Sequence, residues 1–257
     1  MTPLPPDAEL AIEQLAAALA PAPVVLVGAS AIDRHLPLTW RKTNDLDIVA
    51  AVEVDTFQGL AGKLLGWSPT RTEHAWMSPQ GVHVDIIPAG PSLLASGSLT
   101  FPRSGNTMSL IGLDLAFAHA EALQVRSQRI GVAPLPVLIV LKMISWIDRP
   151  DRTHDLQDIA QILDEWLPED DDRRYEDDVF AASLDHDAIP PFVLGRTLST
   201  ILKPPHRERV ERFLARVEDE ASHYHYQMRR LGPYGRFDDG DSPVTPRLAA
   251  FRLGLGA

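Results

Sequence analysis

The sequence predicts an α+β fold in which a mixed sheet with flanking helices is followed by a helical C-terminal domain. Within the first hundred residues, short apolar runs typical of strands alternate with segments that have helical spacing. From Leu113 onward the pattern is mainly helical. We therefore expect an α/β domain over residues 1–133 and a helical domain over 134–257, with an acidic linker at about 168–180.

The N-terminal domain is expected to alternate helices and strands. Helices are predicted over residues 7–20, briefly after Ser30, and over 57–65, and strands over 24–27, 46–52 and 129–132. Two further strands, 75–77 and 82–87, form a hairpin around the Ser78-Pro-Gln-Gly81 turn. In the second half, Pro136 is well placed at the first turn of a helix. The helices expected there cover 137–147, 155–166, 191–202, 207–231 and 246–255.

Composition and charge exclude several classes of protein. The chain lacks cysteine, which rules out disulfides, thiolate catalysis and Cys-ligated zinc. Its longest apolar run ends at Lys142, far short of a membrane span, and no basic residue precedes Arg34, so we expect a cytoplasmic protein without a secretory signal. The formal net charge of −11 means that any polyanion must be bound by a local basic cluster.

Three aspartates lie on strand-like segments. In Asp45-Leu-Asp47 both carboxylates point to the same face, because side chains alternate along a strand. Carboxylates this close repel each other unless a cation lies between them, and Mg²⁺ (or Mn²⁺) prefers such oxygen ligands together with substrate phosphates. Asp85 completes a three-carboxylate metal site if its strand is a neighbour. The alternative is that Asp45 caps a turn and Asp85 lies at an exposed edge.

A turn of small residues precedes these carboxylates. Gly28-Ala-Ser30 ends the first apolar run, and its glycine would let the backbone approach a phosphate closely. Ser30 and the first amides of the following helix would donate hydrogen bonds to that phosphate. Arg41 and Thr43 are expected to contact phosphate or to shape the strand, although Arg41 could equally be a surface charge.

A polar group in the helical half suggests a cationic site. Lys142, Ser145 and Arg149 share one helical stripe at i, i+3 and i+7, and Lys142 with Arg149 or Arg152 could bind a triphosphate. Asp155 and Asp158 could orient these cations or balance them as a surface ion pair. The alternative for Lys142 is a side chain that extends along the apolar surface to reach solvent.

The N-terminal motifs resemble those of the polymerase-β-like nucleotidyltransferase superfamily. The resemblance lies in a strand ending in Gly28-Ala-Ser30, a brief helix, the strand around Asp45-Leu-Asp47 and a later strand with Asp85. The family's first glycine pair reads Gly-Ala here, and the gap between Ser30 and Asp45 is longer than in its compact members.

The second half resembles the AbiEii-like toxin nucleotidyltransferases and their uncharacterised bacterial relatives. The likeness is carried by Leu141-Lys-Met-Ile-Ser-Trp-Ile-Asp-Arg149 and His154-Asp-Leu-Gln-Asp-Ile159, where His154 replaces the usual Lys or Arg. It extends weakly through Leu194-Gly-Arg196 and Phe251-Arg-Leu-Gly254, so it covers most of the chain.

The resemblance implies a metal-dependent nucleotidyltransferase that moves a nucleoside monophosphate from a nucleoside triphosphate to an acceptor hydroxyl. It implies Asp45 and Asp47 as metal ligands, Asp85 as ligand or general base, and functional roles for Lys142 and Asp155. The acceptor it implies is tRNA or another RNA, with the chain acting as the toxin of a toxin–antitoxin or phage-defence pair and an antitoxin protein as partner.

Two alternatives stay open. One is a small-molecule nucleotidyltransferase of the antibiotic-modifying kind, which needs no basic groove. The other is a non-catalytic antitoxin or partner-binding module on the same fold, against which the three carboxylates argue.

Overall fold

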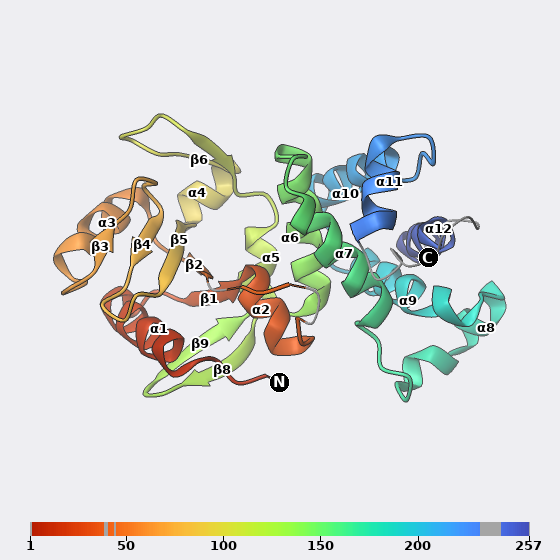
Figure 1. Cartoon of the computed structure of the whole chain (residues 1–257), viewed down its shortest axis with the longest axis horizontal. Helices are drawn as coiled ribbons and strands as arrows, with labels where there is room; N and C mark the ends of the chain where they lie inside the picture. Colours follow the sequence, from red (N-terminus) through yellow and green to blue (C-terminus); the bar gives the residue numbers. More distant parts are fainter. Residues whose placement is uncertain (1, 39–40, 44, 232–242, 257) are drawn as a thin grey trace. The chain divides into compact units, whose positions relative to one another are not determined.

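The computed structural model describes residues 2–38, 41–43, 45–231 and 243–256. These fall into two compact units, Met1–Leu138 and Ile139–Ala257, coloured red to green and green to blue in Figure 1. The division lies within helix α6 (Leu135–Asp148). Every helix in the described part of the chain is too short or too polar to cross a membrane.

Unit 1 is built on a seven-stranded mixed sheet with the order β3-β4-β5-β2-β1-β9-β8. The interior strand β1 is buried along its whole length, as expected for a strand covered on both faces. It runs antiparallel to β2 and parallel to β9, while β2 runs parallel to β5. The strands are β1 (Val24–Val27), β2 (Asp45–Ala50), β3 (Ser68–Pro69), β4 (Ala75–Met77), β5 (His83–Pro88), β8 (Glu121–Val125) and β9 (Gln128–Val132).

Helices pack on this sheet through their apolar sides. Helix α1 (Pro6–Leu19) starts with a proline at its first turn and contacts β8 and β9. Helix α2 (Gly28–His35) contacts β1 and β2, and α5 (Leu113–Ala118) contacts β1. The short elements α3 (Val54–Gln58), η1 (Gly59–Gly62) and α4 (Pro91–Ser96) lie between strands, and a separate hairpin joins β6 (Ser98–Thr100) to β7 (Thr107–Ser109).

Unit 2 is helical. Its core includes Trp146 of α6, which is fully buried and meets the rings of Phe213 and Tyr224 edge-on, a favourable geometry for aromatic pairs. The elements after α6 are α7 (Thr153–Glu165), η2 (Asp172–Tyr175), α8 (Asp177–Ala182), η3 (His186–Ala188), α9 (Ile189–Ser199), α10 (Pro204–Val217), α11 (His223–Leu231) and α12 (Val244–Leu255).

Helices α9 and α12 approach each other backbone to backbone at two glycines. A Cβ on Gly195 would lie 2.1 Å from the carbonyl oxygen of Phe251, and one on Gly254 would lie 2.1 Å from that of Phe192. Gly195 and Gly254 belong to Leu194-Gly-Arg196 and Phe251-Arg-Leu-Gly254, the two segments through which the resemblance extends only weakly. Their physical role is to permit this close crossing.

The predicted fold class is confirmed, since a mixed sheet with flanking helices precedes a helical region. Element boundaries differ in places. The helix expected over 57–65 is the pair α3 and η1, and the helix expected over 207–231 is interrupted at 218–222. Ser222 ends this interruption by accepting the amide of His225, which starts a new helix.

The acidic segment that was expected as a solvated linker at about 168–180 is mostly exposed and carries short helices. It forms η2 and α8, and both lie inside unit 2. Arg174 is buried there because its guanidinium donates to the carbonyl oxygens of Leu167 and Pro168 at 2.7 Å each. Arg174, which belongs to a charged run in the sequence, therefore fixes this segment through hydrogen bonds to the backbone.

Candidate active site

The three predicted aspartates lie on one face of the sheet. In the parallel pair β2–β5, Asp45 is paired with His83, and Asp47 with Asp85. Residues paired in register on neighbouring strands point to the same face, so these four side chains lie together. We call this group the carboxylate face. The intervening side chains point to the opposite face and are at most 3% exposed: Leu46, Ile48, Val84 and Ile86. The alternation predicted from the sequence is thus present.

This carboxylate face is open to solvent. The side chain of Asp45 is 63% exposed and that of Asp85 is 28% exposed, while Asp47 is half-buried. Asp45 is therefore the most accessible of these carboxylates, whereas Oδ1 of Asp85 is a buried atom.

Gly28 lies directly against Asp47. Its φ is +67°, a left-handed conformation that glycine adopts without cost. A Cβ at this position would lie 2.0 Å from Oδ2 of Asp47. Both the conformation and the contact therefore require glycine where the chain passes from β1 into α2.

The side chain of Ser30 contacts the backbone of β2, the strand that carries Asp45 and Asp47. Its buried hydroxyl donates a 2.6 Å hydrogen bond to the carbonyl oxygen of Asp45. Ser30 thus fixes the start of β2, and its contact with a phosphate stays a prediction. Arg41 and Thr43, both half-buried, lie shortly before β2, and their phosphate contacts also stay predictions.

Two histidines that belong to none of the sequence motifs flank Asp85. Nδ1 of His83 lies 3.6 Å from Oδ1 of Asp45 and 3.8 Å from Oδ1 of Asp85. Nε2 of His74 lies 4.0 Å from the other oxygen of Asp85. Strand alternation already placed His83 on the face of Asp85, whereas His74 comes from the β3–β4 turn, where no periodicity could identify it.

Asp47 and Asp85 are the residues of this face that could hold a magnesium ion, and the metal site stays a prediction. Among the described residues, no three His, Asp or Glu side chains are arranged to hold a metal. Magnesium, however, is commonly held by one or two carboxylates while substrate phosphates and water supply the remaining oxygens. Asp47 and Asp85 are direct register partners and meet this smaller requirement, with the bare backbone of Gly28 beside them.

The predicted cation Lys142 lies in a buried ion cluster within unit 2. Its ammonium is 2.8 Å from Asp155 and 2.9 Å from Asp158, and all three side chains are buried. Burial would lower the pKa of Lys142, but the two carboxylates outweigh it and hold the pKa above its ordinary value. Arg152 binds the other oxygen of Asp155 at 3.0 Å, and Arg149 is exposed.

The expected pairing of Lys142 with the two aspartates is therefore present, as a buried cluster and not as the surface ion pair that was one alternative. Its ammonium already has two carboxylate partners, and triphosphate binding by Lys142 and Arg149 stays a prediction.

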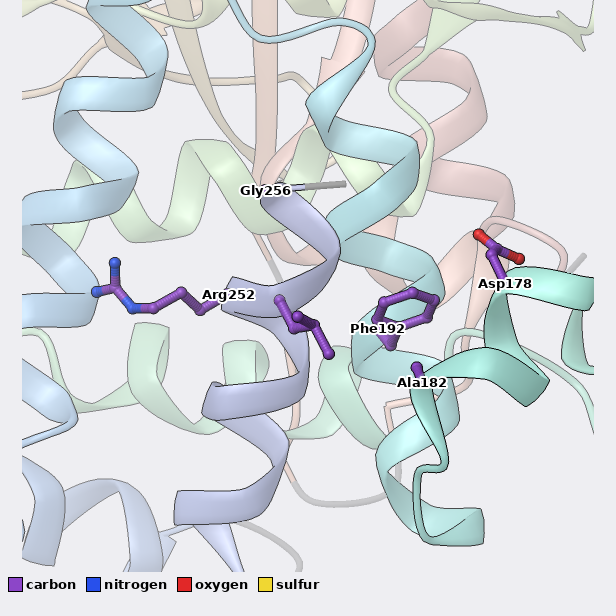
Figure 2. Close-up of a pocket in the computed structure, with 6 residues that line it drawn as sticks. Asp178, Ala182, Phe192, Arg252 and Gly256 are labelled. Atoms are coloured by element: carbon purple, nitrogen blue, oxygen red, sulfur yellow. The ribbon is translucent and has the colours of Figure 1, made fainter.

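Unit 2 also contains a pocket of about 430 Å³, shown in Figure 2, which includes none of the predicted site residues. The charges at its rim are already bound. Arg252 is held by Glu218 and Glu211, and Asp178 by Arg196. The lining residues are Asp178, Ala182, Phe192, Arg252, Leu253 and Gly256.

Comparisons with known proteins give structural matches alone. No protein-family model and no curated protein matches the chain. The chain is similar to the solved structure of an antigenic nucleotidyltransferase-like protein from Paracoccidioides brasiliensis, with 13% identity over 89% of this chain and 95% of that chain, at a TM-score of 0.42. It is also similar to the antibiotic-resistance factor ANT(2'')-Ia, with 14% identity over 56% of this chain and 74% of that chain, at a TM-score of 0.36.

Proposed function

We propose that the chain is a magnesium-dependent nucleotidyltransferase, which moves a nucleoside monophosphate from a nucleoside triphosphate to an acceptor hydroxyl and releases pyrophosphate. The supporting observation is the register pairing of Asp47 with Asp85 on a solvent-open face, against the backbone of Gly28. Two like charges fixed side by side favour a shared cation. The remaining coordination positions of that cation would be filled by phosphate oxygens.

Each residue of the carboxylate face has a role in this proposal. Asp47 and Asp85 would hold the Mg²⁺ (or Mn²⁺) ion, with Asp45 as a third carboxylate, and the bound ion would neutralise charge on the phosphoryl group. Asp85 could alternatively accept the proton of the acceptor hydroxyl. Gly28 leaves room for the carboxylate of Asp47, and its bare backbone would let a phosphate approach. Ser30 holds Asp45 in place by donating to its carbonyl oxygen.

Besides the predicted contact of Lys142 with the triphosphate, Lys142 and Asp155 have a structural role in the proposal. Both side chains are buried, and together with Asp158 they form the ion cluster of unit 2. Loss of this cluster would reduce activity through the stability of the unit.

Two acceptors are candidates. The AbiEii-like resemblance favours an RNA such as tRNA, and with it a toxin role and an antitoxin protein as partner. The net charge of −11 favours a small hydroxyl compound, because such an acceptor needs no basic surface.

The experiment is nucleotide transfer from each labelled nucleoside triphosphate with Mg²⁺, offered total tRNA and separately a set of small hydroxyl compounds. Label on one acceptor class identifies the substrate. Asp47→Asn should abolish transfer, whereas Asp55→Asn, at an exposed carboxylate on α3, should not. Absence of transfer to either class, together with absence of Mg²⁺-dependent nucleotide binding, would contradict the proposal.

A further inference from the structure

The β6–β7 hairpin is fastened to the β3–β4 turn by a single carboxylate. Glu73 accepts the backbone amide of Arg103 at 2.9 Å, and both the amide and the hydroxyl of Ser104 at 2.8 and 2.7 Å. We call these three residues the hairpin latch. Figure 1 shows the hairpin next to α4, above the ends of β4 and β5.

The latch carboxylate is largely enclosed by its hydrogen-bond donors. Its side chain is 9% exposed. Burial would raise the pKa of Glu73, but the hydrogen bonds from Ser104 and the Arg103 amide outweigh it and hold the pKa below its ordinary value. Glu73 therefore stays charged, and charge-assisted hydrogen bonds of this kind are the stronger ones.

The residue after Glu73 connects the latch to the carboxylate face. The ring of His74 packs on Phe101 of the hairpin, with centroids 5.2 Å apart. Its backbone carbonyl accepts the amide of Ile86, the residue after Asp85, at 2.7 Å. Its Nε2 lies 4.0 Å from Asp85. His74 is thus held between the hairpin and the strand that carries Asp85.

We propose that Glu73 is a positioning residue, which holds the hairpin against His74 and thereby orients the carboxylate of Asp85. A catalytic carboxylate acts within narrow geometric limits, set by the side chains that pack around it. The consequence for the reaction rests on the proposed nucleotidyl transfer, whereas the effect on His74 does not.

The chain supplies a matched control at the opposite edge of the same sheet. Glu13 fastens the β8–β9 turn in a similar way, accepting the amide of Ser127 at 3.1 Å, its hydroxyl at 2.6 Å and Nε of Arg126 at 2.7 Å. The strands β3 and β8 form the two edges of the sheet, so Glu13 serves the turn remote from Asp85. Glu13→Gln should weaken a turn without disturbing the carboxylate face.

The kinetic experiment compares Glu73→Gln with Glu13→Gln in the full chain. We expect Glu73→Gln to lower kcat about 10-fold or more, with KM for the nucleotide nearly unchanged. Ser104→Ala, which removes one of the three hydrogen bonds, should give a smaller effect in the same direction. Glu13→Gln should leave kcat unchanged. An equal kcat in wild type and Glu73→Gln would overturn the proposal, as would equal losses in both Gln variants.

A second measurement separates this proposal from the proposed function. The imidazole NMR signals of His74 should shift or broaden in Glu73→Gln and in Phe101→Leu, and should stay unchanged in Glu13→Gln. This readout needs neither nucleotide nor activity. Unchanged His74 signals in Glu73→Gln would refute the positioning role even in an active enzyme, whereas shifted signals in a chain without transfer activity would refute the proposed function alone.

Discussion

Lys142→Met tests whether the buried ion cluster stabilises unit 2. The substitution keeps the length and the apolar stem of the side chain, but it leaves Asp155 and Asp158, which are 1% and 0% exposed, without the ammonium. Removing one partner of a buried ion pair costs about 3–5 kcal/mol. Arg152 still neutralises part of Asp155, so we expect a cost of about 3 kcal/mol. For a chain of this size the melting temperature should fall by roughly 6–12 °C.

Thermal unfolding followed by circular dichroism measures this loss. Adding Asp158→Asn to Lys142→Met removes one of the two carboxylate charges that lost the ammonium. The double variant should therefore lose less stability than the two single variants lose together, by about 1 kcal/mol or more. Folding raises the pKa of Lys142 above its ordinary value of 10.5. The stability that Lys142 contributes is therefore complete below pH 10.5 and is lost only as pH rises through the pKa of the folded state. An unchanged melting temperature, or a loss that disappears between about pH 6 and 9, would refute the reasoning.

Three further perturbations test other parts of the structure. Gly28→Ala places a methyl group against Asp47 at a φ of +67°, so it should cost about 1–2 kcal/mol in urea denaturation and abolish nucleotide transfer. Gly195→Ala places a methyl group 2.1 Å from a backbone carbonyl of α12 and should cost about 1–3 kcal/mol or more, again measured in urea. The hydrogen bonds from Arg173 lower the pKa of Asp171 to about 2. Asp171→Asn should therefore lower the melting temperature slightly at neutral pH, and this difference should vanish as pH falls from about 4 through about 2.

Gly59→Ala is the control for both glycine substitutions. No atom lies within 4 Å of the Cβ that it would add, and its φ of −71° suits any residue. A stability loss in Gly59→Ala as large as in Gly195→Ala would show that the close helix crossing is not the cause.

The carboxylate face could be predicted from the sequence because it depends on a local rule. Alternation along a strand places Asp45 with Asp47, and His83 with Asp85, whatever the rest of the fold does. The register that brings Asp47 beside Asp85 depends on a parallel pairing between strands far apart in the chain. No local pattern determines that pairing.

The environment of Lys142 was only half predictable. Spacing at i, i+3 places Asp155 and Asp158 on one face of a helix, and the sequence suggested that they pair with Lys142. Their burial depends on how α6 packs against α7, which periodicity does not reveal. The latch residue Glu73 lies in a turn, and its partner Ser104 is 31 residues further along the chain, so no sequence signal identifies it.

The glycine crossing of α9 and α12 limits how unit 2 can move. Sliding one helix along the other would replace each glycine at the crossing by side chains that share its face three or four residues away, such as Phe192 and Phe251, and there is no space for a Cβ there. Shear between packed helices is one of the common modes of conformational change. It is sterically blocked here, so we expect α9 and α12 to move as one rigid body in any rearrangement of the unit.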